Sequence, residues 1–213
     1  MALIPIVMIT AWQVRVQQQM DAFVPIAVNG WAVIAGANCD ATFHGDRVGS
    51  WELPCVKVVE AAERGHIGEV AANRYARDVG VRYAREHLVD LPRVALARVA
   101  RTFGLYQPWR ELEIESYFEG RHEAWSKVGY LMYLAMAGIA GYGWVHRSRA
   151  HSNRSKRGRA LFIVPWIAVL LSTVAGYGNH RFRIPVEPLI VVGASMAIVE
   201  FARRRSVLER SVA

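Results

Sequence analysis

Residues 128–145 read VGYLMYLAMAGIAGYGWV, a run of eighteen residues without a charged side chain. Residues 160–179, ALFIVPWIAVLLSTVAGYGN, form a second uncharged run of twenty. A helix rises about 1.5 Å per residue, so each run is long enough to reach across a hydrocarbon core roughly 30 Å thick. Both runs therefore predict transmembrane helices. The alternative is a set of buried helices in a soluble protein.

Two weaker apolar segments lie outside these runs. Residues 184–202 are interrupted by Glu187 and Glu200. They fit a tilted or short span if both glutamates lie at the membrane interfaces. Residues 1–12 are too short to cross a bilayer and lack the basic start and cleavage site of a signal peptide. We expect them to be the outer end of a transmembrane helix whose beginning is missing; the alternative is a short buried or membrane-surface helix.

The net charge of +8 arises from 26 Lys and Arg against 18 Asp and Glu. Residues 13–127 carry a balance of −1, and the rest of the chain carries +9. The basic residues gather in the loop 146–159 and in the tail 203–213. Because positive residues in short loops mark the cytoplasmic side, both segments are predicted to be cytoplasmic and residues 13–127 extracytoplasmic. This partition argues against a nucleic-acid partner.

The predicted fold is therefore mainly α-helical and polytopic. It has about three transmembrane helices at 128–145, 160–179 and 184–202, a partial N-terminal one, and a helical or irregular extracytoplasmic segment. The predicted location is the plasma membrane, with several passes and membrane lipid as a partner.

Cys39 and Cys55 bound a loop rich in Gly, Asp, Pro and Ser. In an extracytoplasmic segment these two thiols can form a disulfide, provided that the fold brings them within bonding distance. A metal site is the weaker alternative. His44 and Asp46 lie nearby, but they follow no recognised ligand spacing.

The rest of the middle region is predicted to be largely helical. Residues 58–88 are rich in Ala, Glu and Arg, and Pro92 favours the start of a new helix that ends near Gly104. That helix suits a membrane surface and a packed position equally well. Residues 110–116, RELEIES, alternate acidic and apolar side chains, which predicts a short strand or an extended link.

Generic catalytic motifs are absent from the sequence: it contains no Gly-rich phosphate loop, GxSxG, HExxH or CxxC pattern. Five carboxylates could supply a general base, although a solvated face is the simpler interpretation. They are Glu111, Glu113, Glu115, Glu119 and Glu123.

The segment 179–188, NHRFRIPVEP, is the strongest candidate for a binding site. It places His180, Arg181 and Arg183 in a short link at the predicted outer membrane surface. Arginine offers a planar fork of donors that matches phosphate oxygens. Glu187 can brace these arginines or contact a polar ligand. The alternative is ordinary interfacial anchoring at the start of a helix.

Four stretches resemble bacterial integral-membrane glycosyltransferases of the GT-C fold, in the family 39, mannosyltransferase-like and aminoarabinose-transferase-like groups. The segment YGNHRFRIPVEP at 177–188 resembles their C-terminal motif. The cysteine-bounded stretch 35–55 looks like an extracytoplasmic loop of the actinobacterial members. Residues 97–121 and 11–30 are similar to other segments of the same proteins.

The resemblance implies an enzyme that transfers a sugar from a polyprenyl-phosphate carrier to an acceptor on the outer face of the membrane. It implies an acidic catalytic residue in an early outer loop, often assisted by a divalent metal. That loop has no counterpart in this sequence, so no catalytic or metal-binding residue is carried over. We expect a C-terminal portion, or a late-started reading frame, that is inactive alone. A non-catalytic membrane protein that presents a small outer domain to a partner is the competing interpretation.

Overall fold

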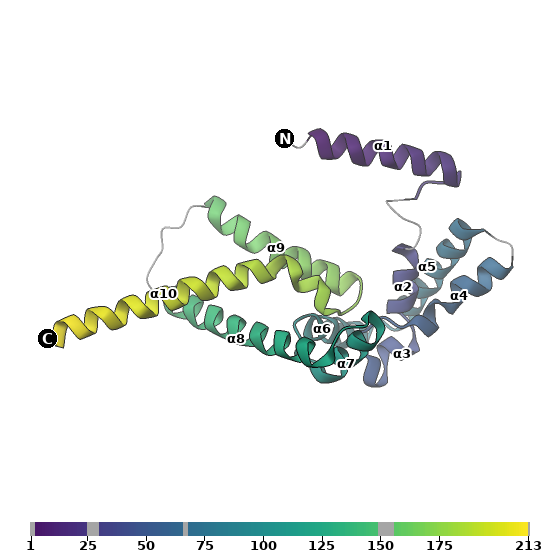
Figure 1. The fold of residues 1–213 in the computed structure, drawn as a ribbon. Coiled ribbons are helices and arrows are strands. Elements are labelled where there is room, and N and C mark those ends of the chain that lie inside the picture. Colours follow the sequence, from purple (N-terminus) through teal and green to yellow (C-terminus); the bar gives the residue numbers. More distant parts are fainter. Residues whose placement is uncertain (1–2, 25–29, 66–67, 149–155, 213) are drawn as a thin grey trace. The chain divides into compact units, whose positions relative to one another are not determined.

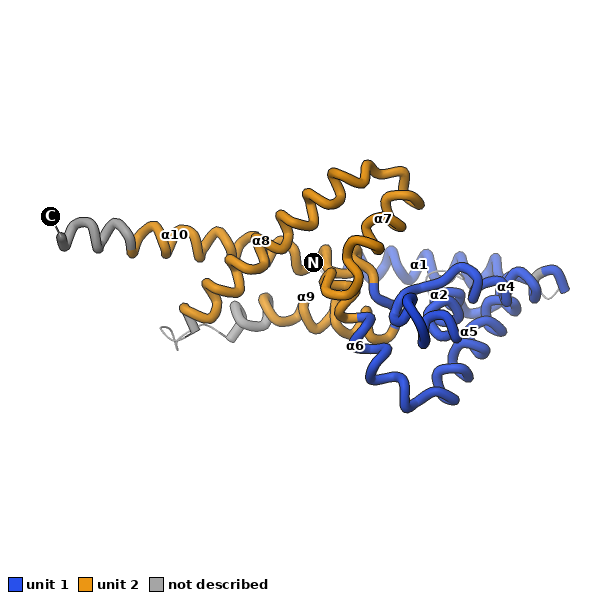
Figure 2. Tube along the Cα trace, turned by 90° about the horizontal axis from the view of Figure 1, so that it is seen from below, with its two compact units in different colours: residues 1–98, 176–178 blue, residues 99–175, 179–213 orange. Residues whose placement is uncertain are grey.

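The computed structural model describes residues 3–24, 30–65, 68–148 and 156–212. Every regular element in these residues is a helix, and none is a strand. Helices were therefore predicted correctly as the dominant structure. The described chain divides into two compact units, residues 1–98 with 176–178 and residues 99–175 with 179–213 (Figure 1, Figure 2).

Unit 1 contains five α-helices, one 3-10 turn and the first part of a sixth α-helix. Their bounds are α1 Leu3–Met20, α2 Gly30–Ala37, α3 Asp40–Phe43, η1 Gly45–Arg47, α4 Leu53–Arg64, α5 Glu69–Glu86 and α6 Leu91–Thr102.

The N-terminal helix is longer than the sequence predicted. Residues 1–12 were expected to end a transmembrane helix, but α1 continues to Met20. No residue of α1 is buried, and its apolar side chains are exposed.

The core of unit 1 is built from α2, α4 and α5. Small apolar side chains, including Ala35, Ala72 and Ala76, form one buried cluster. Gly80 allows the close approach of α5 to α2, because a Cβ at this position would lie 2.6 Å from the backbone oxygen of Ile34. A second cluster joins Phe43 to Val94 of α6.

The helix predicted at 92–104 is observed as α6, and one of its faces is packed. Val94 and Ala97 are buried, although Leu96 remains exposed.

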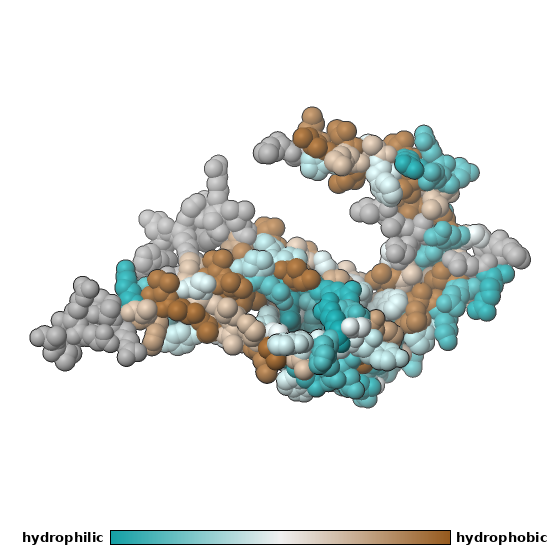
Figure 3. Space-filling model, in the orientation of Figure 1, coloured by the Kyte–Doolittle hydropathy of each residue, from teal (hydrophilic) through white to brown (hydrophobic). Residues whose placement is uncertain are grey.

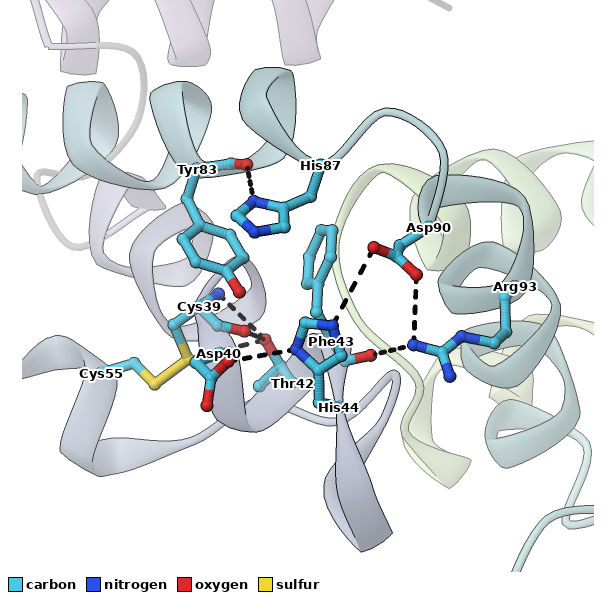
Figure 4. A network of polar contacts seen from close by, with 10 residues as sticks. All are labelled: Cys39, Asp40, Thr42, Phe43, His44, Cys55, Tyr83, His87, Asp90 and Arg93. Atoms are coloured by element: carbon cyan, nitrogen blue, oxygen red, sulfur yellow. Dashed lines mark hydrogen bonds and ion pairs between the residues drawn. A yellow bond between two sulfur atoms is a disulfide. The ribbon is translucent and has the colours of Figure 1, made fainter.

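The cysteine-bounded loop of unit 1 is held by a disulfide and a network of polar contacts (Figure 4). Cys39 and Cys55 are joined, with their Cα atoms 6.2 Å apart. His44 lies with its Nδ1 3.1 Å from Asp40 and its Nε2 3.9 Å from Asp90. Arg93 donates to the carbonyl oxygen of Phe43 at 2.7 Å. These contacts tie the loop to the start of α6.

Unit 2 contains the end of α6, then α7 Pro108–Glu119, α8 Glu123–Ser148, α9 Lys156–Ala175, η2 His180–Val186 and α10 Glu187–Val212. The helices α8 and α10 pack along each other at small residues. A Cβ on Gly193 of α10 would lie 3.2 Å from the Cβ of Ala140 in α8. The end of α6 meets α9, where the Thr102 and Thr173 hydroxyls lie 3.2 Å apart and Phe103 stacks on Trp166.

The strand or extended link predicted at residues 110–116 is wrong, because α7 is a helix over this whole segment. Pro108 begins it, and Gly120 ends it in the left-handed conformation with φ +64°. The alternation of acidic and apolar residues misled the prediction. Glu111, Leu112 and Ser116, at helical spacing, are the buried residues of this helix.

Among the described residues, two helices are long and apolar enough to cross a membrane, at Glu123–His146 and His180–Arg204. Only 6% and 17% of their most apolar windows are buried. Figure 3 shows hydrophobic residues along these helices and on α1. In the second predicted span, the apolar part of α9 among the described residues is Phe162–Ala175, which is shorter than these two helices. The basic loop at 146–159 lies partly outside the described residues.

The observed helices also differ in length from the predicted spans. The helix α8 extends beyond 128–145 at both ends, α9 ends at Ala175, and α10 begins at Glu187. The segment before α10 is the separate turn η2, so the third predicted span does not start as one continuous α-helix at Ile184.

Candidate functional site

The candidate site is built on η2, the turn between α9 and α10. Asn179 begins it, with its side-chain oxygen accepting a hydrogen bond from the Arg181 backbone N–H at 2.8 Å. A 3-10 helix has three residues per turn, so residues three apart share a face. His180, Arg183 and Val186 are accordingly the buried residues of η2. Arg181 falls on another side of the turn.

Each basic side chain of η2 has an acidic partner. His180 Nδ1 lies 3.4 Å from Glu115 Oε2, and Arg183 Nε donates to Glu187 Oε1 at 2.8 Å. The Arg183 guanidinium also lies 3.7 Å from the centre of the Tyr133 ring, a cation–π contact. These contacts hold the two side chains in fixed positions against α7, α8 and α10.

Arg181 is placed differently from its neighbours. Its guanidinium pairs with Glu119 of α7, and its side chain is 58% exposed. The candidate site therefore brings together three of the four residues that the sequence suggested for phosphate binding, His180, Arg183 and Glu187, and leaves Arg181 at the surface.

A cavity of about 720 Å³ lies beside η2, between α7, α8 and α10. The lining of the cavity is polar near the N-terminal end of α8 and apolar further along that helix. His122 directly precedes α8 and Trp125 lies in its first turn, whereas Met132 and Met136 lie two to four turns later. The same order holds on α10, where Glu187 precedes Ile190 and Val191. The cavity therefore suits a molecule with a polar head and a hydrocarbon tail.

Three side chains that line the cavity carry a buried polar atom without a hydrogen-bond partner among the described residues. These atoms are Glu115 Oε1, His180 Nε2 and Arg183 Nη1. His180 and Arg183 are each only 8% exposed. A buried polar group without a partner costs about 1–3 kcal/mol, and more if it is charged. A ligand or an ordered water that supplies the missing partners would recover part of this cost.

Gly104, just after α6, supports the buried groups from the other side. Its φ of +71° favours glycine. A Cβ on Gly104 would lie 2.6 Å from the ring of Tyr130 and 3.5 Å from both His180 Nε2 and Arg183 Nη1. The Gly104 carbonyl oxygen accepts a hydrogen bond from the Tyr130 hydroxyl at 2.6 Å. A side chain at this position would push against the groups that border the cavity.

The surroundings of Glu115 in the site shift the pKa of its carboxyl group. Burial raises its pKa, but the hydrogen bond and charge of His180, with the charges of Arg181 and Arg121, outweigh burial. The pKa of Glu115 is therefore below its usual value, and the carboxylate is ionised at neutral pH. The carboxyl groups of Glu115 and Glu187 offer acceptors to a ligand, and the guanidinium groups of Arg121 and Arg183 offer donors.

The other carboxylates considered from sequence have different surroundings. Glu111 is buried and pairs with Arg101, Glu119 pairs with Arg181, and Glu123 pairs with Lys127. Glu113 is exposed. Glu115 alone of the five lines the cavity.

Glu115, Arg121 and Trp125 line one site, which the sequence did not predict. The cavity-lining residues of α8 recur at helical spacing, and this spacing could have predicted that they share one face. Nothing in the spacing could have joined Glu115 to His180, because 65 residues separate them.

Within the described residues, no group of three or more His, Cys, Asp or Glu side chains is arranged to hold a metal ion. Comparisons of the chain with protein-family models, with curated proteins and with solved structures give no significant match.

Proposed function

We propose that the chain forms the donor-binding part of a membrane glycosyltransferase. Its ligand is a sugar linked to a polyprenyl phosphate, and the sugar is transferred to an acceptor on the outer face of the plasma membrane. The observation that carries the proposal is the cavity beside η2, polar at one end and apolar at the other. The transfer step itself rests on the resemblance of the four sequence stretches.

The polar end of the cavity fits a phosphorylated sugar. The guanidinium groups of Arg183 and Arg121 suit phosphate oxygens, because charge-assisted hydrogen bonds are the strong ones, and the ring of His180 lies beside them. Carboxylates such as Glu115 accept hydrogen bonds from sugar hydroxyls, and the Trp125 ring offers an apolar face. The apolar end, with Met132 and Met136, suits the first isoprene units of the carrier.

The proposal includes the three-span topology. In it α8 and the η2–α10 segment cross the bilayer with α9 between them, and the basic loop and tail are cytoplasmic. Trp125 and Trp144 support a span by α8. They lie nineteen residues apart, which corresponds to about 28 Å along a helix, and both are largely exposed. Tryptophan gathers at the two interfaces of a bilayer at about this separation.

The test is the affinity of the chain, reconstituted in lipid nanodiscs, for a polyprenyl-phosphate sugar. Arg183→Ala removes a buried cation of the cavity and should weaken binding about 10- to 100-fold, the equivalent of one charged hydrogen bond of about 1.5–3 kcal/mol. Arg181→Ala is the matched control from the same turn and should bind nearly as the wild type does.

Failure of the wild-type chain to bind this ligand would overturn the proposal. It would favour the alternative, a non-catalytic membrane protein with an outer partner-binding domain. Equal losses in both variants would show that the cavity does not hold the phosphate.

A further inference from the structure

Three aromatic side chains of unit 2 are exposed where α7 ends and α8 begins. Tyr117, Phe118 and Trp125 are 84%, 76% and 73% exposed. The Tyr117 and Phe118 rings contact each other edge to face, with centroids 5.6 Å apart. We call these three residues the aromatic rim. Exposing large rings together in this way is unfavourable in water.

The rim has a fixed position along α8. The left-handed Gly120 reverses the chain, and α7 folds back on the first turns of α8. The Ser116 hydroxyl donates to the Ser126 hydroxyl at 3.1 Å, and Trp109 meets Tyr130 edge to face. Ser116 directly precedes Tyr117, so the rim lies level with the start of α8, just before the uncharged run that begins at Val128.

We propose that the aromatic rim inserts into the headgroup boundary of the bilayer and sets the depth of unit 2 in the membrane. The inference rests on the proposed membrane span of α8. A bilayer surface is favoured over a protein partner because the rim is continuous along the chain with that helix. Its content of Tyr and Trp, which join an apolar ring to a polar group, is also typical of this boundary.

The rim also determines where the cavity lies. Trp125 belongs both to the rim and to the cavity lining, and Arg121 and His122 line the cavity between the two halves of the rim. With the rim at the headgroup boundary, these groups lie at the level of lipid phosphates. The apolar lining around Met132 and Met136 then lies within the hydrocarbon layer.

The experiment uses the full chain in phosphatidylcholine vesicles, with tryptophan fluorescence quenched by lipids brominated either near the headgroup or near the chain ends. Trp125→Phe is compared with the wild type, and Trp51→Phe of unit 1 is the control. The wild type should lose more fluorescence to headgroup-proximal bromine. The difference in quenching between the two brominated lipids should be smaller in Trp125→Phe and unchanged in Trp51→Phe.

A double variant, Tyr117→Ser with Phe118→Ser, should also lower the headgroup-proximal quenching of Trp125. The exposed Val89→Ser change in unit 1 should leave it unaltered. Alkaline carbonate extraction of the same vesicles separates the two proposals. A retained chain whose Trp125 is not quenched by either lipid overturns the aromatic rim alone. A chain that is extracted overturns both the span and the rim.

Discussion

Gly104 shows how one backbone position holds the candidate site. Its left-handed φ and its contact with Tyr130 bring the end of α6 against the groups that border the cavity. From the sequence, Gly104 is predicted only to end a helix, because a positive φ and a long-range contact leave no periodic pattern.

We expect Gly104→Ala to destabilise unit 2 in two ways. Alanine in the left-handed region costs about 1–2 kcal/mol, and the clash with the Tyr130 ring adds a further overpacking cost of about 1–3 kcal/mol. Gly120→Ala is the matched control, because Gly120 also has a positive φ but open space around its Cβ position. In thermal unfolding in detergent, the melting temperature should fall more for Gly104→Ala than for Gly120→Ala. Equal falls would mean that the Tyr130 contact is unimportant.

Glu115 gives the site a dependence on pH. Its folded-state pKa lies below the ordinary value of 4.5, so near that pH the unfolded chain binds more protons than the folded chain. Its contribution to stability is therefore present above pH 4.5 and lost as the pH falls through the lowered pKa. The difference in melting temperature between the wild type and Glu115→Gln should narrow on acidification. A difference that stays constant with pH would contradict the His180–Glu115 pairing.

Among the secondary-structure elements, α7 is one whose type the local sequence predicted wrongly. The segment RELEIES alternates in a way that suits a strand, but Pro108 and Gly120 delimit a helix whose buried residues share one face. Long uncharged runs, by contrast, predicted α8 and α9, and the apolar segment 184–202, interrupted by two glutamates, predicted most of α10. Their ends were missed by several residues, because η2 and its cap depend on contacts with Glu115 and Thr102 far away in sequence.

The packing of α8 on α10 should depend on Gly143. A Cβ at this position would clash with Ala197, whereas Gly138, on the same helix, has open space. Gly143→Leu should therefore force the two helices apart and lower the melting temperature in detergent, since close backbone approach is what small residues provide in membrane helices. Gly138→Leu should be tolerated. The reverse order of the two effects would mean that the helices pair through a different face.

For the whole molecule, the partition of charge is the feature that sequence alone described best. The net +8 separates into a nearly neutral middle region and a strongly basic remainder, which predicts the orientation of the chain. The cavity could not be predicted in the same way, because it assembles α7, α8, η2 and α10 from separate parts of the chain. His180, Arg183 and Glu187 were predicted as ligand-binding residues, and Glu115 only as one of five carboxylates that could act as a general base.

The most direct test of the central claim is photocrosslinking of the nanodisc-embedded chain to a polyprenyl-phosphate sugar that carries a diazirine on its first isoprene units. Peptide mapping should place the crosslinks at Met132, Met136 or Val191, and unlabelled ligand should compete for them. Crosslinks spread over exposed α10 residues outside the cavity, such as Val192 and Ile198, without competition, would contradict a lipid-linked sugar-phosphate site in this cavity.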